Sequence, residues 1–299
     1  MHPPTFPSTR FRHVIFPAEA LHKRLLSVLP ARDVELPRPQ QVSLSEENAL
    51  FLQWLFAQAG LELTCYRPET LHRRLPACFR ALEVRSATQA RRLLEQSPAH
   101  LSIALDAMLV GVTSLFRDPP VFDILRDTIA CELARGRSGL TVWSAGCSDG
   151  AELYSTALLL AEQGLLFASY LLGTDCRPVA IEQAKKGSFD PLEMRNVPTD
   201  LRNRYFHLRA GRWEVVQAVR SLLRWKVSDL LRAPEPGIWD VILCRNTTMY
   251  MRTEMLDGLW ERFEQGLRPG GVLVLGKAER PAKSKRLVAL GPCLYRRTR

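Results

Sequence analysis

Residues 142–155 are where residue types and spacing point most directly to chemistry. An apolar run at 142–145 leads into a turn with Gly146 and Gly150, and a helical pattern starts directly after it. Such a turn brings bare backbone and a helix N-terminus against a bound ligand. No Gly-Lys-Ser/Thr follows Gly150 and the pattern is not a strict G-x-G-x-x-G, so neither phosphate-binding fingerprint is present. Taken alone, the two glycines fit a tight turn without a ligand equally well.

Three polar residues stand at the ends of later apolar runs, namely Asp175, Asp229 and Asn246. In an open parallel sheet, ligands bind at the carboxyl ends of the strands, near the point where the strand order reverses. A carboxylate such as Asp175 can accept hydrogen bonds from both hydroxyls of a ribose. Each of the three residues alone is also typical of a helix N-cap. Together with the glycine turn, they predict a nucleoside-type ligand.

The elements that must position these residues alternate along the second half of the chain. Short apolar strands are predicted at 140–145, 169–174, 223–228, 239–244 and 271–276, and helices at 150–163, 177–186 and 253–267. This alternation predicts a mostly parallel sheet covered on both faces, in a doubly wound, Rossmann-like α/β domain. Residues 188–222 break the rhythm and are too long for a simple connection, so we expect a small inserted subdomain there.

The first half of the chain has a different texture. Residues 1–42 are Pro-rich with little periodicity and predict a poorly ordered leader. Residues 43–110 read as a small all-helical domain that begins with a capping-box spacing at Ser43 and Glu46. It continues with helices at 68–82 and 87–96 and one that Ser97 and Pro98 open. The α/β domain then covers 111–299.

Composition sets limits without choosing a function. Hydrophobic residues make up 46% and charged residues 24% of the 299 residues, which is ordinary for a globular protein with a sizeable core. No apolar run reaches the ~18–20 residues that a membrane span needs. The net charge of +10 suits an acidic partner, although basic side chains scattered over the surface would give the same value. Seven widely spaced cysteines without a C-x-x-C motif predict reduced thiols in a cytoplasmic protein and no metal site.

These motifs occur together in a family. In order, the chain resembles the bacterial chemotaxis-receptor methyltransferases, the CheR family, in Val-Thr-Ser-Leu-Phe-Arg-Asp at 112–118, Trp-Ser-Ala-Gly-Cys-Ser at 143–148, Gly-Thr-Asp at 173–175, Trp-Asp-Val-Ile-Leu-Cys-Arg-Asn at 239–246, Leu-Arg-Pro-Gly-Gly-Val-Leu at 267–273 and Gly-Lys-Ala-Glu at 276–279. The resemblance covers about residues 45–298. It implies a class I methyltransferase domain that uses S-adenosylmethionine, yields S-adenosylhomocysteine and esterifies glutamate side chains of a chemoreceptor-like protein.

The resemblance also implies the residues that contact the cofactor. Beside Gly146 and Gly150 of the turn, they are Thr113, Arg117, Glu152, Asp175, Asp229 with Leu230, and Asn246 with Thr247. Glu152 is expected to face the cationic amino group and Asp175 the ribose. Arg117 can pair with a carboxylate of the cofactor or of the substrate, or form a structural ion pair with Asp118 or Glu152.

The chain departs from the family pattern at several positions. Gly111 stands where the family has asparagine, and the turn carries Asp149 and Ala151 where the family has threonine and glutamate. Hydrogen-bond partners are therefore missing and a negative charge is added. We interpret the chain as a divergent member.

The implied reaction needs no general base. A glutamate with a pKa near ~4.3 is already ionised at neutral pH, so catalysis rests on positioning. Arg117 and Tyr250 are the candidates for holding the carboxylate, although Tyr250 equally fits packing at a strand end. The substrate is expected to be an acidic, helical receptor signalling domain. Arg73, Arg74 and Arg80 on the helix at 68–82 are its candidate contacts, and a solvated helix face is the alternative.

Two other functions remain open. A non-catalytic methyltransferase-like module that binds a signalling partner is favoured by Gly111, Asp149 and Ala151. A nucleic-acid methyltransferase is favoured by the net charge but lacks an Asn/Asp-Pro-Pro-Tyr/Phe motif, because Cys-Arg-Asn-Thr stands at 244–247 instead. We expect a monomer without nucleic acid and without membrane insertion, associated at the membrane through its receptor. In some family members a subdomain like 188–222 grips a receptor tail.

Overall fold

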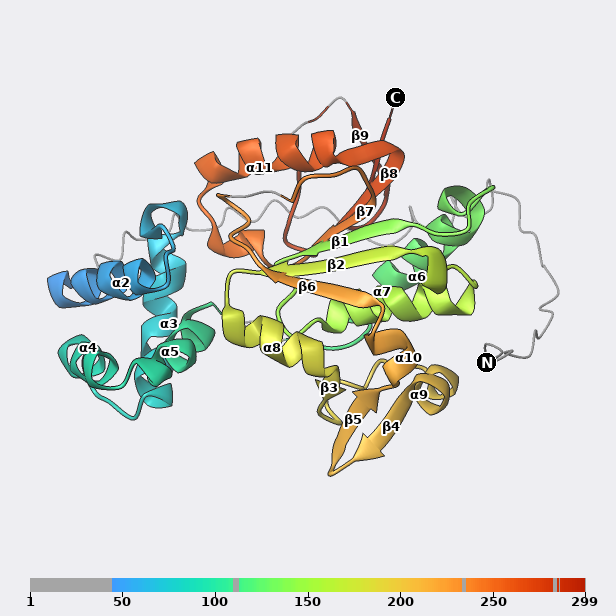
Figure 1. Cartoon of the computed structure of the whole chain (residues 1–299). Coiled ribbons are helices and arrows are strands. Elements are labelled where there is room, and N and C mark those ends of the chain that lie inside the picture. The colour runs from blue at the N-terminus through green and yellow to red at the C-terminus, as the bar shows by residue number, and fades with distance from the viewer. Residues whose placement is uncertain (1–44, 110–112, 233–234, 282–283, 285, 299) are drawn as a thin grey trace, which may run out of the picture. The chain divides into compact units, whose positions relative to one another are not determined.

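A seven-stranded sheet is the frame of the α/β part of the chain (Figure 1). The computed structural model describes residues 45–109, 113–232, 235–281, 284 and 286–298. The strands of the sheet are β1 (Thr141–Ala145), β2 (Tyr170–Asp175), β6 (Leu223–Val227), β7 (Trp239–Cys244), β8 (Leu267–Leu275), β9 (Leu287–Gly291) and β10 (Leu294–Arg297). All five strands predicted between residues 140 and 276 are present, and β8 begins earlier than expected.

The strand order contains one reversal that matters for function. The order is β6-β2-β1-β7-β8-β10-β9, and the first five strands of this order run parallel. The chain moves outward from β1 to β2 and β6 and then returns to the other side of β1 as β7. The reversal therefore lies between β1 and β7, where a doubly wound sheet opens its ligand crevice. The predicted doubly wound, Rossmann-like fold is confirmed.

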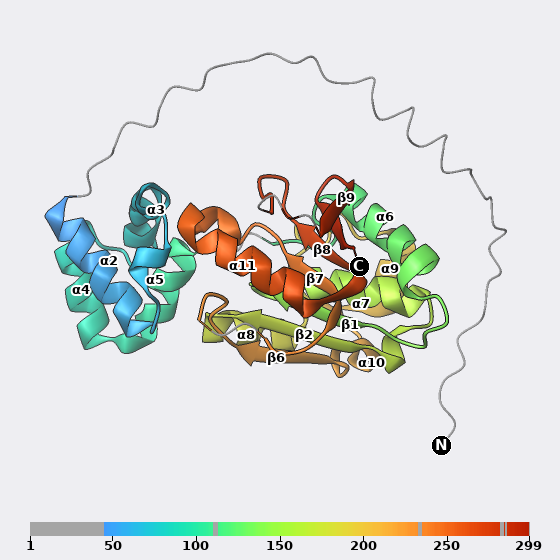
Figure 2. The ribbon, with the colours of Figure 1, turned by 90° about the horizontal axis from the view of Figure 1, so that it is seen from above.

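Helices cover both faces of the sheet because its strands are apolar on both sides. They are α6 (Pro119–Thr128), which continues as a π-helix (Ile129–Leu133), α7 (Ala151–Glu162), α8 (Pro178–Lys186) and α11 (Thr253–Gly266). Val142 and Val241 pack in one core with α6 and α7, whereas the next residues, Trp143 and Ile242, pack in another with Phe263 of α11. Figures 1 and 2 show α11 running beside β7 and β8, on the face opposite α6 and α7.

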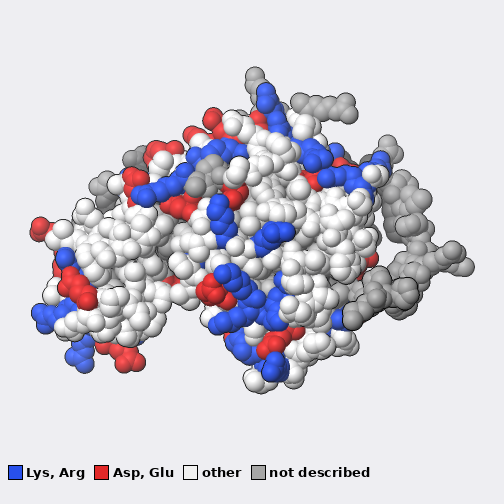
Figure 3. All heavy atoms as spheres, in the orientation of Figure 1, with Lys and Arg blue, Asp and Glu red and all other residues white. Residues whose placement is uncertain are grey.

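A second, three-stranded sheet lies between α8 and β6, in the region of the predicted insertion. Its order is β3-β5-β4, with β3 (Ser188–Phe189), β4 (Phe206–Arg209), β5 (Arg212–Val215), α9 (Thr199–Tyr205) and α10 (Gln217–Arg220). Figure 3 shows Lys and Arg side chains gathered over this sheet and the end of α8. Among the exposed ones are Lys185, Lys186 and Arg209. Part of the basic character of the chain is therefore displayed here.

The residues before the α/β part form helices with a core of their own. They are α2 (Glu46–Gln58), α3 (Pro68–Ala81), α4 (Ala87–Gln96) and α5 (Leu101–Met108), with short 3₁₀ turns at Leu63–Cys65 and Pro98–His100. The predicted cap Ser43 lies outside the described residues. The cap of α2 is Ser45, whose hydroxyl accepts a hydrogen bond from the Asn48 N–H at 3.4 Å. Ser97 opens a 3₁₀ turn in place of the expected α-helix, and α5 follows it.

The predicted domain boundaries fall on residues that the structure does not describe. The leader 1–42, Gly111 and the junction at 110–111 all lie outside the described ranges, so this division of the chain stays a prediction. All seven cysteines are described as free thiols, and five of them are buried. Among the described helices, none combines the length and the apolar character that spanning a membrane requires.

Tyr154 joins the helix after the glycine turn to three neighbouring elements. Its hydroxyl donates to the Ala184 carbonyl at 2.9 Å, and its ring packs against Phe189 and Trp225. We expect Tyr154→Phe to lower the free energy of unfolding by about 1 kcal/mol, because one buried hydrogen bond is lost while the packing remains. Urea denaturation measures this.

The control is Tyr170→Phe, whose side chain is 41% exposed on β2. A change within about 0.5 kcal/mol is expected for this surface position. Equal effects of the two substitutions would contradict the role given to the Tyr154 hydroxyl.

Candidate active site

The turn after β1 requires glycine at both predicted positions. Gly146 has φ +72° and Gly150 has φ +85°, a region that other residues rarely adopt. A Cβ on Gly146 would lie 2.6 Å from the Thr247 hydroxyl oxygen, and one on Gly150 would lie 2.4 Å from the Trp225 ring. The turn therefore lies tightly between the segment after β7 and the edge strand β6.

Two cavities open at the carboxyl ends of the strands, and they meet at the reversal. The first, of about 580 Å³ with its opening, is lined by Tyr66, Leu109, Gly146, Asp175, Cys176, Arg177, Ser228, Asp229, Leu230, Asn246, Thr247, Tyr250 and Met251. The second, of about 360 Å³, is lined by Thr113, Ser114, Arg117, Gly146, Cys147, Ser148, Glu152, Arg245 and Asn246. Gly146 after β1 and Asn246 after β7 belong to both. Every predicted cofactor contact except Gly150 lines one of the two cavities.

Asp175 is engaged by neighbours within the chain. Its Oδ1 accepts from the backbone N–H and from Nε of Arg177, both at 3.0 Å, and its Oδ2 accepts from the Ser148 N–H at 2.9 Å. Arg177 also donates to Oδ1 of Asp106 on α5 at 2.9 Å. Burial alone would lower the pKa of Arg177. The carboxylates of Asp175 and Asp106 raise this pKa by more than burial lowers it, so the guanidinium stays charged. Sequence reasoning missed Arg177, although a cation two residues after Asp175 was a usable signal.

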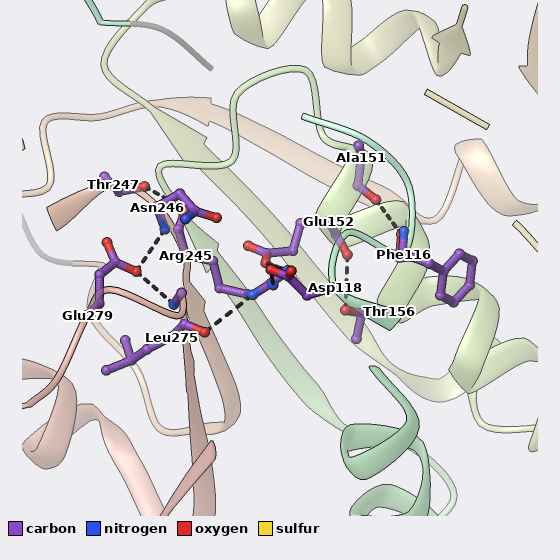
Figure 4. A network of polar contacts seen from close by, with 12 residues as sticks. Phe116, Asp118, Ala151, Glu152, Thr156, Arg245, Asn246, Thr247, Leu275 and Glu279 are labelled. Carbon is purple, nitrogen blue, oxygen red and sulfur yellow. Dashed lines mark hydrogen bonds and ion pairs between the residues drawn. The ribbon is translucent and has the colours of Figure 1, made fainter. Parts of the chain in front are cut away.

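A second buried arginine organises the other cavity (Figure 4). Arg245 donates to Glu152 at 3.1 Å and to Asp118 at 2.9 Å, and Lys277 reaches the other oxygen of Asp118 at 2.6 Å. Burial raises the pKa of Glu152, and Arg245 acts against this shift. Asp118 and Glu152, the carboxylates considered as ion-pair partners of Arg117, are thus paired with Arg245, and the charge of Arg117 also acts to lower the pKa of both. Arg245 lies in the motif at 239–246, but no role was predicted for it from the sequence.

Glu279 holds the segment that carries Asn246. Its side chain is almost fully buried, and Oε2 accepts from the backbone N–H groups of Asn246 and Gly276, each at 2.7 Å. Oε1 accepts from the N–H and the hydroxyl of Thr248, each at 2.8 Å. Asn246 has φ +57°, so these bonds fix a backbone conformation that is uncommon for a residue with a side chain. Figure 4 shows Glu279 beside Asn246 and Arg245.

The segment after Asn246 is also joined to the helical region by backbone hydrogen bonds. The Arg67 N–H donates to the Tyr250 carbonyl at 2.9 Å, and the Arg252 N–H donates to the Cys65 carbonyl at 2.9 Å. This pairing brings Tyr66 to the first cavity, where Leu109 also lies. The contribution of Tyr66 and Leu109 to the site was not predicted from the sequence.

The remaining predicted residues are placed as follows. Tyr250 lines the first cavity and Arg117 the second, so the two candidates for holding a substrate carboxylate come from different sides of Asn246. Arg73 and Arg80 are exposed on α3, whereas Arg74 is partly buried and donates to the Ala107 carbonyl at 3.2 Å. In the part of the chain that the structure describes, no group of three His, Cys, Asp or Glu side chains is placed to hold a metal ion. The roles of these residues stay predictions.

Of the departures from the family pattern at Gly111, Asp149 and Ala151, the last two lie inside the described residues. Ala151 is fully buried at the start of α7. Asp149 is hydrogen-bonded by the Thr113 side chain and lies beside Glu193, and burial raises its pKa to about 7. Burial and the neighbouring Glu193 thus hold the pKa of a carboxyl group in this turn well above its usual range.

The comparisons with known proteins agree with this geometry. A family model described as CheR methyltransferase, SAM binding domain, matches residues 111–291. Chemotaxis protein methyltransferase 1 of Pseudomonas aeruginosa is 30% identical over 251 residues, which are 79% of this chain and 92% of that protein. A chemotaxis protein methyltransferase of Listeria innocua is 26% identical over 238 residues, 79% of this chain and 90% of that protein.

Two further similarities are more limited. An uncharacterized 104.1 kDa protein of Rhodobacter capsulatus is 32% identical over 222 residues, but the match spans only 23% of its length against 72% of this chain. Among solved structures, the N-methyltransferase NodS of Bradyrhizobium japonicum in complex with S-adenosyl-L-homocysteine is 17% identical, covering 57% of this chain and 70% of that one, with a TM-score of 0.34. A score this low adds nothing to the strand order described above.

Asp149 predicts a pH dependence of stability. Its pKa is higher in the folded chain than the ordinary 3.8. The stabilisation by its protonated form is therefore complete below about pH 4 and lost as the pH rises through about 7. The variant Asp149→Asn escapes this loss. Its melting temperature relative to the wild type should rise between pH 4 and 7 and stay level above that range.

Asp257→Asn is the control, because Asp257 is exposed on α11. Melting curves at several pH values measure both variants. A difference between Asp149→Asn and the wild type that does not change with pH would refute the assignment.

Proposed function

The chain belongs to the CheR methyltransferase family, and we propose on this basis that it transfers a methyl group from S-adenosylmethionine to glutamate side chains of a chemoreceptor-like signalling protein. The observation that carries the proposal is the pair of cavities that share Gly146 and Asn246, the residues that follow β1 and β7 at the strand-order reversal. A ligand with a nucleoside end and a charged amino-acid end has the matching two-part shape.

The polar groups of the two cavities fit the two ends of this cofactor. In the first cavity, the carboxylate of Asp175 would accept from a ribose hydroxyl, while Leu109 and Leu230 offer apolar surface to the adenine. In the second cavity, Glu152 would face the amino group, and Thr113 and Arg117 would bind the carboxylate. When bound, the cofactor supplies an electrophilic methyl group on a sulfonium sulfur.

The chain's own residues then have to bring a carboxylate to that methyl group. Because a glutamate carboxylate is already ionised at neutral pH, no side chain of the chain would have to accept a proton from it. Tyr250 would hold the glutamate carboxylate from the first cavity and Arg117 from the second, with the guanidinium of Arg117 shared between this carboxylate and that of the cofactor. Asn246, fixed by Glu279, would separate the two ends of the cofactor. Positioning of the glutamate against the methyl group and exclusion of water would account for the rate acceleration.

The proposed substrate is an acidic, helical receptor domain in the cytoplasm. Arg73 and Arg80 are exposed on α3, seven residues apart and therefore close to one face of the helix. Arg74 is tied to Ala107 and would contribute less. A basic helix face attracts an acidic helix and orients it during encounter. We expect the enzyme to act as a monomer.

One observation favours a second candidate function, a module that binds a signalling partner without catalysis. Asp175 and Glu152, the two carboxylates expected to bind the cofactor, are each ion-paired with an arginine of the chain itself. The cofactor would have to share these carboxylates with Arg177 and Arg245.

Calorimetric titration with S-adenosylmethionine and S-adenosylhomocysteine tests the cofactor site. We expect micromolar binding by the wild type and about 10- to 100-fold weaker binding by Asp175→Asn, because hydrogen bonds to a charged acceptor contribute about 1.5–3 kcal/mol. Asp190→Asn serves as the control and should bind normally. Absence of binding by the wild type would exclude the enzyme function, whereas binding without methyl transfer to any receptor would support the non-catalytic module.

Charge reversal on α3 tests the substrate surface. We expect the double variant with Arg73→Glu and Arg80→Glu to lower kcat/KM for a receptor signalling domain at least ~10-fold at low salt, with less effect at high salt. Its affinity for S-adenosylhomocysteine should not change. The control carries the same charge change at Arg85 and Arg92, which are exposed near α4 and on it. Equal losses in both double variants would locate the effect in net charge and not in α3.

A further inference from the structure

Arg177 connects the nucleoside side of the site to the helical region. It stands between β2 and α8, and its side chain is 9% exposed. One edge of the guanidinium donates to Asp175, Nη2 donates to the Ser148 hydroxyl at 3.1 Å, and Nη1 donates to Asp106 at 2.9 Å. A single side chain thus touches the end of β2, the glycine turn and α5.

Arg177 and its neighbours fix the orientation of the Asp175 carboxylate. An ionised carboxylate has about four acceptor positions. The backbone N–H and Nε of Arg177 use both positions of Oδ1, and the Ser148 N–H uses one of Oδ2. The contact from Nη2 to Oδ2 is long, at 3.5 Å. A ligand hydroxyl would take this weakly held position of Oδ2, on a carboxylate that cannot rotate without breaking three shorter hydrogen bonds.

Asp106 holds the other end of the guanidinium. It lies on α5, outside residues 111–291 that match the methyltransferase family model, and it is half-exposed at 41%. Burial raises the pKa of Asp106, and Arg177 acts against this shift. A bidentate, planar guanidinium transmits orientation better than an ammonium, because its donors are fixed relative to one another. Asp106 can therefore act on Asp175 through Arg177 without touching a ligand.

We propose that Arg177 is a positioning residue for the ribose-binding carboxylate of Asp175, and that Asp106 makes cofactor affinity depend on the helical region. This inference rests on the proposed function, since it assigns the ribose to Asp175. Arg177 acts by orienting Asp175 and not by competing with the cofactor for it. The helical region, which carries the proposed substrate surface on α3, thereby becomes part of the cofactor site.

Calorimetric titration of the full chain with S-adenosylhomocysteine tests the proposal. We expect Asp106→Asn to weaken binding about 3- to 10-fold and Arg177→Gln about 10-fold or more. The double variant should bind like Arg177→Gln alone, because Asp106 acts only through Arg177. Arg177→Lys should restore part of the affinity. Asp257→Asn, exposed on α11, is the matched control and should bind normally.

A second ligand separates positioning from general damage to the fold. The wild type should lose affinity for the 2′-deoxy analogue of S-adenosylhomocysteine, since one ribose hydroxyl is missing. In Arg177→Gln this loss should shrink, because Asp175 is no longer oriented toward that hydroxyl, whereas a merely structural change would weaken both ligands equally.

The outcomes are distinct. Tighter binding by Arg177→Gln would show competition and overturn the proposal, as would unchanged affinity in both single variants, equal weakening of both ligands or additive effects in the double variant. Failure of the wild type to bind S-adenosylhomocysteine would instead remove the proposed function, and this inference with it.

Discussion

Burial of carboxylates at the end of a parallel sheet is the constraint on which the site depends. Asp175 and Glu279 are almost fully buried, and Glu152 and Asp118 are mostly so. A buried charge is tolerated only if it is paired or fully hydrogen-bonded. The chain meets this requirement with Arg177, with Arg245 and with backbone N–H groups. Each solution joins segments that are far apart in the sequence.

The two arginines are alike in arrangement although they come from different elements. Arg177 joins Asp175 to Asp106, and Arg245 joins Glu152 to Asp118. Each therefore links one carboxylate expected to contact the cofactor to one that is not expected to. Truncating one partner of such a pair is costly, because the other charge stays buried without compensation. The arginines consequently make the geometry of both cavities sensitive to residues outside them.

The sequence predicted the elements well because their signals are local. The strands from 140 to 276 alternate with helices, and apolar runs bounded by turn residues are recognisable without tertiary information. The prediction that Asp175 and Asn246 lie close together is confirmed, because parallel strands bring their carboxyl ends to the same edge of the sheet. The sequence predicted the N-cap at Ser43, two residues before the N-cap at Ser45, because either serine hydroxyl can accept a hydrogen bond from a backbone N–H of the first helical turn.

Partner choice could not be predicted in the same way. Arg177 and Arg245 are two among 41 basic residues, and nothing in the local sequence says which carboxylate each will meet. Glu279 is the last residue of the motif at 276–279, yet its four hydrogen bonds depend on how β8 lies beside β7. Tyr66 and Leu109 belong to the helical region, so their place in the first cavity follows only from the tertiary fold.

These features together argue that the helical region is a functional part of the cofactor site. The segment at 250–252 is bound by backbone hydrogen bonds to the segment at 65–67, and it follows directly on the Asn246 loop that Glu279 holds from the other side. Asp106 meets the same site through Arg177. A movement of the helices on binding a substrate helix would therefore reach both Asn246 and Asp175. Coupling of this kind is reciprocal, so an occupied cofactor site would in turn stabilise the arrangement of the helices that the proposed substrate selects.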